Sequence, residues 1–134
     1  MNKKMISYAG KVVYAGIDVH KETYVVACVV DGQVAKSAST KADPQGLATS
    51  LRAWFEGATI RSVYEAGYFG FVLHRALVKV GVDNMVINAA SLKTAANDRV
   101  KTDKRDPKKL ASDLSKGDLQ GVAGSSGGEI ALSR

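Results

Sequence analysis

The sequence predicts a single α/β domain in which a mixed β-sheet is flanked by helices. Three short runs rich in β-branched residues come first, and alternating helical and strand patterns follow them. The 134 residues are 46% hydrophobic and 24% charged, which is ordinary globular composition and enough for one core. Because strands joined by tight turns are antiparallel and strands joined through helices are usually parallel, the sheet should be mixed.

The first three predicted strands form an antiparallel meander. Apolar runs occupy 12–19 (VVYAGIDV) and 23–30 (TYVVACVV), and a third run, QVAKSAS, begins at Gln33. Asp31 and Gly32 lie between the second and third runs. This dipeptide is typical of a two-residue hairpin turn, because glycine supplies the positive φ that such a turn needs.

Helices and strands alternate after the meander. Asp43 and Pro44 are typical of a helix start, and the apolar spacing that follows them predicts a helix that stops at Gly57. Strand character returns at 59–66 (TIRSVYEA), and an amphipathic helical pattern follows at 68–81.

A short strand and a helix complete the predicted fold. DNMVINA at 83–89 has strand character, and DPKKLASDLSKG begins with Asp106 and Pro107 and ends at Gly117. The resulting order is that of the ribonuclease H-like fold with a five-stranded mixed sheet flanked by helices. Actin-like ATPase lobes begin in a similar way, so the order by itself leaves both folds open.

We assign residues 1–122 to the folded domain and residues 123–134 to a flexible tail. The segment from Gly124 onward, GSSGGEIALSR, is rich in glycine and serine and has no periodic apolar face. It is therefore left out of the fold prediction.

Charge and hydropathy narrow the class of partner. The net charge of +6 and the pI near 9.5 favour a polyanion over a basic partner. Ser7, Gly10 and Lys11 interrupt the amino-terminal apolar residues, and no run approaches the roughly 18 apolar residues of a membrane span. We therefore expect a cytoplasmic protein. The single cysteine, Cys28, lies in an apolar run and is expected to be a buried core residue.

Four acidic residues form a candidate metal site. Asp18 and Glu65 lie near the ends of two predicted strands, where a carboxylate needs a compensating partner. Asp103 and Asp106 are three residues apart at the entrance to the last helix, where like charges repel unless a cation lies between them. Mg²⁺ prefers carboxylate oxygens, and two ions roughly 4 Å apart stabilise the attacking and leaving oxygens of a phosphoryl displacement.

The second acidic pair lies within the most basic stretch of the chain, KTDKRDPKKL. Lysine and arginine side chains there are suited to nucleic-acid phosphates. The candidate nucleic-acid-binding residues are Lys21, Arg99, Lys101, Lys104, Arg105, Lys108 and Lys109. The alternative is that Asp106 is only a helix N-cap, Asp103 only a solvated loop residue, and the basic residues only an exposed helix face.

Three segments resemble the conserved blocks of the DEDD-type transposases of bacterial insertion sequences, a group that includes the pilin-gene inverting recombinase. They are YAGIDVHKETYVVACV, YEAGYFGFVLHRAL and DRVKTDKRDPKKLASDL, in the family's order, within a resemblance that runs from Val12 to about Val122. The resemblance implies a RuvC-like domain that catalyses DNA strand cleavage and exchange during transposition. It also implies a catalytic tetrad that binds Mg²⁺, or Mn²⁺ in its place: Asp18, Glu65, Asp103 and Asp106.

The resemblance also sets expectations about partners and completeness. It implies DNA as substrate, a structured guide RNA in some members, and a homo-oligomer in the full-length protein. Members continue into a helical domain with a serine nucleophile, and neither Ser125 nor Ser126 matches that serine. We therefore expect a truncated product that is inactive alone. The alternative is a non-catalytic fragment that binds nucleic acid or another recombinase subunit.

Residues beside the candidate tetrad leave two interpretations open. His20 and Lys21 follow Asp18 directly, so they lie either beside the metal and a phosphate or only on the surface of a hairpin end. Their bulk, with that of Val19, argues against the phosphate-binding turn of an actin-like lobe, which uses small residues. His74 is expected to be a surface or half-buried helix residue.

Overall fold

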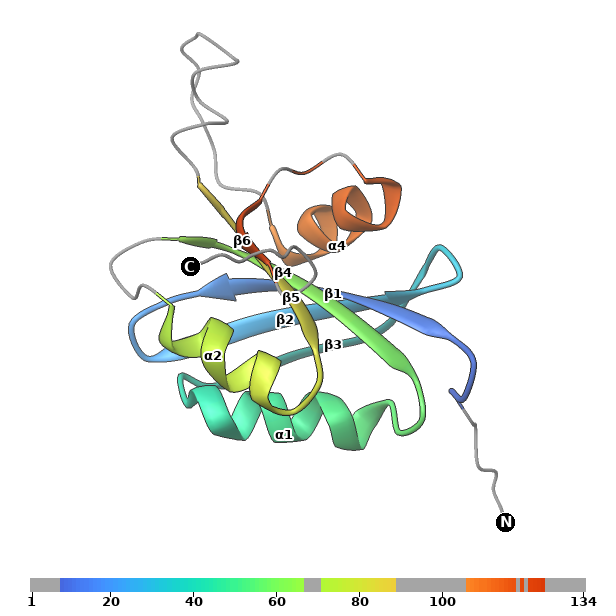
Figure 1. Cartoon of the computed structure of the whole chain (residues 1–134), viewed down its shortest axis with the longest axis horizontal. Helices are drawn as coiled ribbons and strands as arrows, with labels where there is room; N and C mark the ends of the chain where they lie inside the picture. The colour runs from blue at the N-terminus through green and yellow to red at the C-terminus, as the bar shows by residue number, and fades with distance from the viewer. Residues whose placement is uncertain (1–7, 67–70, 89–105, 118, 120, 125–134) are drawn as a thin grey trace, which may run out of the picture.

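The computed structural model describes residues 8–66, 71–88, 106–117, 119 and 121–124, and it has a six-stranded sheet between two layers of helices (Figure 1). The strands are β1 (Val12–Val19), β2 (Thr23–Val30), β3 (Gln33–Lys41), β4 (Thr59–Ala66), β5 (Asp83–Asn88) and β6 (Gly121–Gly124). The helices are α1 (Pro44–Trp54), α2 (Val72–Lys79) and α4 (Pro107–Lys116). Within these ranges no helix has both the length and the apolar character needed to cross a bilayer.

The strand order is β3-β2-β1-β4-β5-β6. Strands β1, β2 and β3 pair antiparallel, as predicted. In the turn between β2 and β3, Asp31 has a φ of 54° and Gly32 a φ of 82°, the two positive values that a type I′ turn requires. The Asp-Gly prediction is therefore confirmed.

Strands β4 and β5 run parallel to β1. Strand β4 pairs parallel with β1, and β5 pairs parallel with β4. This mixed sheet with helices on both faces is the ribonuclease H-like fold, so the predicted fold class is confirmed. Strand β6 pairs antiparallel with β5 and was not predicted, because GVAG is too short to show an alternating pattern. It crosses the expected boundary at residue 122, and the division into domain and tail stays a prediction.

Each face of the sheet has its own core. Helices α1 and α2 cover one face, and α4 covers the other (Figure 1). Burying a leucine side chain contributes roughly 1.5–3 kcal/mol, so these helices are held mainly by their leucines. The larger core includes Leu47 and Leu51 of α1 with Leu73 and Leu77 of α2. The smaller core joins Val63 and Ile87 of the sheet to Leu110, Leu114 and Leu119.

Local signals place the helix ends. Asp43 and Asp106 have extended backbone angles and are each followed by proline at the first helical position, as predicted. Gly117 ends α4 in the left-handed conformation with a φ of 76°. Helix α2 begins at Val72, and residues 68–70 of its predicted range lie outside the described residues.

Candidate functional site

Asp18 and Glu65 are neighbours at the same end of two parallel strands. The register pairs Ile17 of β1 with Tyr64 of β4, so the next residue of each strand is one of the two acids. Parallel strands lie about 4.8 Å apart, and residues in register project their side chains to the same face. The fold therefore places these two carboxylates side by side at the carboxyl ends of β1 and β4.

Alternation along the strands puts both acids on the face covered by α4. Ile17 and Tyr64 belong to the core under α1 and α2, whereas Val63 packs with α4. Side chains point alternately to the two faces, so Asp18 and Glu65 project on the α4 side. Both side chains are partly exposed, with 21% of the Asp18 side chain accessible.

Gly16 allows α4 to approach the sheet next to these acids. A β-carbon at position 16 would overlap the backbone of the first turns of α4, where its nearest neighbours include the Pro107 carbonyl oxygen and the Ala111 nitrogen. The start of α4 therefore lies directly against β1, two residues from Asp18. A glycine within a run of β-branched residues is a known sign of such close backbone approach.

Asp106 begins the helix that packs there. Its Oδ1 accepts a hydrogen bond from the backbone N–H of Lys109 at 2.7 Å, so the predicted N-cap is confirmed. A carboxylate can cap a helix with one oxygen and bind a cation with the other, because each oxygen has two acceptor sites. The capping role and a metal-binding role of Asp106 are therefore compatible.

His20 contacts the first acid of the site. Its Nε2 lies 3.0 Å from Oδ2 of Asp18. The His20 backbone N–H donates to the Thr23 carbonyl at 2.9 Å, which closes the β1–β2 turn and fixes the main chain at His20. The side chain is also 51% exposed at the hairpin end, so His20 is a surface residue that lies beside Asp18, and its position beside a metal and a phosphate stays a prediction.

The predicted basic residues divide into described and undescribed positions. Lys21, Lys108 and Lys109 are exposed. Nζ of Lys109 lies 3.3 Å from Oδ1 of Asp113, whose side chain is only 7% exposed, so this cation already has an anionic partner. The predicted site residues outside the described ranges are Arg99, Lys101, Asp103, Lys104 and Arg105.

The described acids do not by themselves make a complete metal cage. Within the residues that the structure describes, no three histidine, cysteine or acidic side chains gather closely enough to hold a metal ion. The fold brings together two members of the predicted tetrad, Asp18 and Glu65, and packs the helix begun by Asp106 on the same face. These donors are hard oxygens, which suit Mg²⁺ or Mn²⁺.

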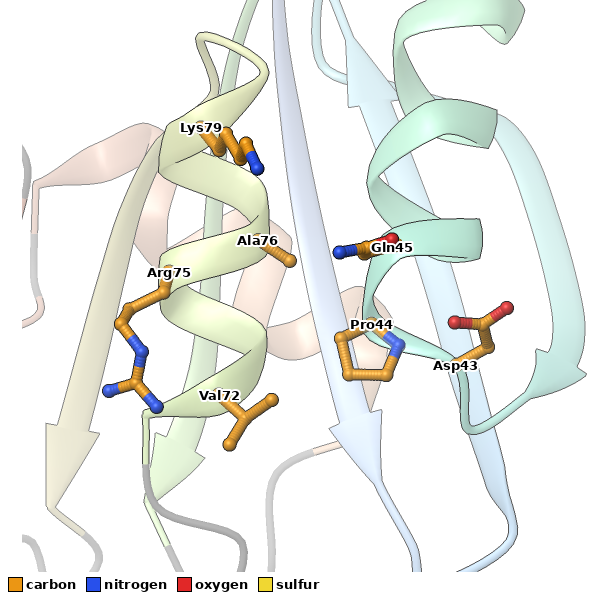
Figure 2. Close-up of a pocket in the computed structure, with 7 residues that line it drawn as sticks. All are labelled: Asp43, Pro44, Gln45, Val72, Arg75, Ala76 and Lys79. Atoms are coloured by element: carbon orange, nitrogen blue, oxygen red, sulfur yellow. The ribbon is translucent and has the colours of Figure 1, made fainter.

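A groove lies on the opposite side of the molecule, between the starts of α1 and α2 (Figure 2). Val72, Ala76 and Lys79 of α2 face Pro44 and Gln45 of α1 across it (Figure 2). Its lining is mixed, with Asp43, Gln45, Arg75 and Lys79 as the polar or charged members, and it contains no pair of carboxylates. Because both helices cover the face opposite α4, the groove is separate from the acidic pair.

Sequence reasoning missed a buried polar network on the face of the sheet that α1 and α2 cover. The hydroxyl of Ser62 donates to Oδ1 of Asn84 at 2.6 Å, and Nδ2 of Asn84 lies 2.9 Å from Nδ1 of His74. The hydroxyl of Tyr64 accepts from the His74 backbone N–H at 3.1 Å. The signal was available, since a serine at 62 interrupts the inward-facing apolar positions of its strand.

Burial sets the protonation of this network. Desolvation, helped by the nearby Arg75 cation, lowers the pKa of His74 from its ordinary value. Desolvation also raises the pKa of Tyr64 to about 12, against the opposing effect of the hydrogen bond from His74. Both side chains are therefore neutral near pH 7.

Comparison with known proteins identifies the family of the chain. A family model described as Transposase, for the DEDD transposases of IS110-type elements, matches residues 15–133. The transposase for insertion sequence element IS1533 of Leptospira borgpetersenii is 33% identical over 102 residues. That match covers 74% of this chain and 30% of the relative, so the chain spans less than a third of the relative's length. The chain belongs to the IS110-type DEDD transposase family.

Proposed function

We propose that this domain is the metal-dependent nuclease module of a transposase, which cleaves DNA strands for exchange. The observation that carries the proposal is the side-by-side placement of Asp18 and Glu65 on the face where α4 begins with Asp106. In this proposal Asp103 completes the tetrad. The cofactor is Mg²⁺, for which Mn²⁺ can substitute.

The donor set supports a divalent cation. Two carboxylates held side by side repel each other, and a cation between them removes that cost. Asp18 and Glu65 are attached to the central strands of the sheet, so their backbone positions are fixed. Asp106 is attached to the rigid first turn of α4. Acidic ligands on such rigid elements are suited to a metal site that must keep its geometry.

The surroundings favour a nucleic-acid substrate. The chain has a net charge of +6, and Lys21 and Lys108 are exposed beside the two ends of the acidic site, in the β1–β2 turn and in the first turn of α4. Exposed lysines bind phosphates without reading the base sequence. We propose that Lys21 and Lys108, together with the basic residues at 99–105, contact the phosphate backbone of the nucleic acid.

The chemistry follows from these roles. A bound divalent cation supplies charge stabilisation for a phosphoryl displacement. Asp18 and Glu65 would hold the cation at the carboxyl ends of β1 and β4. The 3.0 Å contact between His20 and Asp18 orients that carboxylate. The lysines hold the phosphate backbone in place, which lowers the entropic cost of bringing the scissile bond to the site.

The test is metal binding and cleavage by the chain with matched variants. Mn²⁺ is titrated calorimetrically into the wild type, Asp18→Asn, Glu65→Gln and Glu56→Gln. Glu56 is an exposed glutamate beyond the end of α1, on the other face of the sheet. We expect the first two variants to lose binding and the third to retain it. Equal binding by all four would contradict the proposal.

A non-catalytic role is the second candidate function. It is favoured by the exposed Lys21 and Lys108, because lysines bind phosphates without a metal ion. In that case the chain binds DNA, a structured guide RNA or another subunit of the recombinase without cutting. Binding that weakens steeply with salt, with no cleavage of branched DNA in Mg²⁺ or Mn²⁺, would identify this role.

A further inference from the structure

A chain of buried hydrogen bonds joins β4, β5 and α2. Ser62 and Asn84 face each other in the β4–β5 register and are 0% and 1% exposed. The Ser62 hydroxyl donates to Asn84 at 2.6 Å, and Asn84 is bonded in turn to the His74 ring at 2.9 Å. These residues occupy positions where apolar side chains would otherwise complete the core.

The bonding pattern determines which atom is the donor and which is the acceptor in each of these hydrogen bonds. Because Oδ1 of Asn84 accepts from Ser62, its Nδ2 has to be the donor toward His74. Nδ1 of His74 is then an acceptor, and the proton of the neutral ring lies on Nε2. Each of the two bonds then joins one donor to one acceptor, which is the condition for a buried polar contact to be tolerated.

Tyr64 ties the same helix to β4 at a second point. Helix α2 has no side-chain cap at Phe71, so the N–H groups of its first turn need other acceptors. The hydroxyl of Tyr64 accepts from one of them, the N–H of His74, at 3.1 Å. The helix start is therefore bonded to the residue that directly precedes Glu65.

We propose that Tyr64, His74, Asn84 and Ser62 are positioning residues that hold Glu65 in place by locking the end of β4 to the start of α2. The inference rests on the proposed function for the role of Glu65. Tyr64 and Glu65 project to opposite faces of the same strand end. The hydrogen bond of the Tyr64 hydroxyl restrains the Tyr64 side chain on the α2 side, and through it the strand end from which Glu65 projects on the metal side.

The energetics favour this role over simple core filling. Buried polar groups cost free energy to desolvate, whereas apolar residues of similar size would pack without that cost. Apolar packing allows small sliding movements, but a hydrogen bond fixes both a distance and a direction. Here the hydrogen bonds join two strands and a helix, so they restrain all three elements near Glu65.

The first measurement follows the Glu65 side chain directly. The chain contains four glutamates, so labelling their carboxyl carbons with ¹³C gives four signals, and Glu65→Gln identifies the one from position 65. Tyr64→Phe removes only the hydroxyl. We expect it to shift and broaden the Glu65 signal at constant pH while the Glu22 and Glu56 signals stay unchanged. An unchanged Glu65 signal would overturn the inference, whether or not the protein binds metal.

The second measurement separates positioning from stability. His74→Leu removes the acceptor, whereas His74→Asn places a side-chain oxygen near the position of Nδ1. We expect His74→Leu to weaken Mn²⁺ binding about tenfold, as losses of outer-shell partners do, and His74→Asn to restore most of it. Equal affinity in wild type and His74→Leu, with binding lost in Asp18→Asn, would refute the positioning role and leave the proposed function intact. No Mn²⁺ binding by the wild type would refute the proposed function, and the Glu65 signal would still decide the inference.

Discussion

Gly16 of β1 lies against the backbone of Ala111 in α4, so closely that a β-carbon at position 16 would be 2.7 Å from the Ala111 nitrogen. The Cβ of Leu110 would be 2.8 Å away. Neither of these atoms belongs to a flexible side-chain end that can turn aside. The distance between α4 and the sheet is therefore set by the absence of a side chain at one strand position.

Gly16→Ala is expected to destabilise the domain by about 1–3 kcal/mol, because α4 must move away from the sheet and lose part of its leucine packing. Urea unfolding followed by circular dichroism measures this loss. Gly46→Ala is the matched control. Its β-carbon would meet the exposed Asp43 side chain, which can rotate, and alanine gains up to about 1 kcal/mol over glycine in a helix. A Gly16→Ala protein as stable as Gly46→Ala would show that α4 does not pack as described.

Two substitutions at Asp106 separate its cap from its charge. Asp106→Ala removes the acceptor for the Lys109 N–H and should cost about 1 kcal/mol of stability in urea unfolding. Asp106→Asn retains a capping oxygen, so we expect nearly wild-type stability but weaker Mn²⁺ binding in calorimetry. Unchanged Mn²⁺ affinity in the asparagine variant would mean that Asp106 is only a cap.

Cys28 should be unreactive in the folded protein. Its side chain is 0% exposed, and desolvation raises the pKa of its thiol to about 12, against the opposing effect of Lys36. The thiolate is the reactive form, so a disulfide reagent at pH 8 should react only as fast as the domain opens. The expected result is slow labelling in buffer and rapid labelling in urea above the unfolding midpoint. Rapid labelling in buffer would contradict the buried position.

The sequence predicted the elements of this fold well because its local signals agree with its long-range packing. Asp31-Gly32 favours a tight turn, and the two Asp-Pro pairs favour helix starts, through the conformations of these residues alone. Strand β6 carries no such signal, because its four residues gain strand character only from the neighbouring β5. Local patterns identify elements, whereas the pairing of a short edge strand is decided by the sheet.

The candidate site was predictable only in part. Asp18 and Glu65 stood out because each is an acid near the end of an apolar strand, and the parallel register places them together. The contribution of Gly16 depends on which helix packs over it, and the bond between Asn84 and His74 joins residues ten positions apart. Such contacts depend on three-dimensional packing, so the spacing of residues along the sequence does not predict them.

His74 should make stability depend on pH. Burial lowers its pKa in the folded protein below the unfolded value near 6.5, so the unfolded chain binds the proton more strongly. The neutral ring, which accepts from Asn84, therefore contributes its full stabilisation only at pH values above about 6.5. As the pH falls below that value, the unfolded chain takes up the proton first, and the free energy of unfolding decreases. Protonation would place an N–H of the ring against the Asn84 amide donor.

The matched variant for this prediction is His74→Asn, which keeps an acceptor for Asn84 and removes the titrating ring. Urea unfolding is measured at about pH 8 and about pH 5.5, on either side of the ordinary histidine pKa. The free energy of unfolding should fall more in the wild type than in His74→Asn. His20, the other histidine, is present in both proteins, so its contribution cancels in the comparison. An equal fall in the two proteins would mean that His74 binds its proton equally well in the folded and unfolded states, and so that burial and the bond to Asn84 do not lower its pKa.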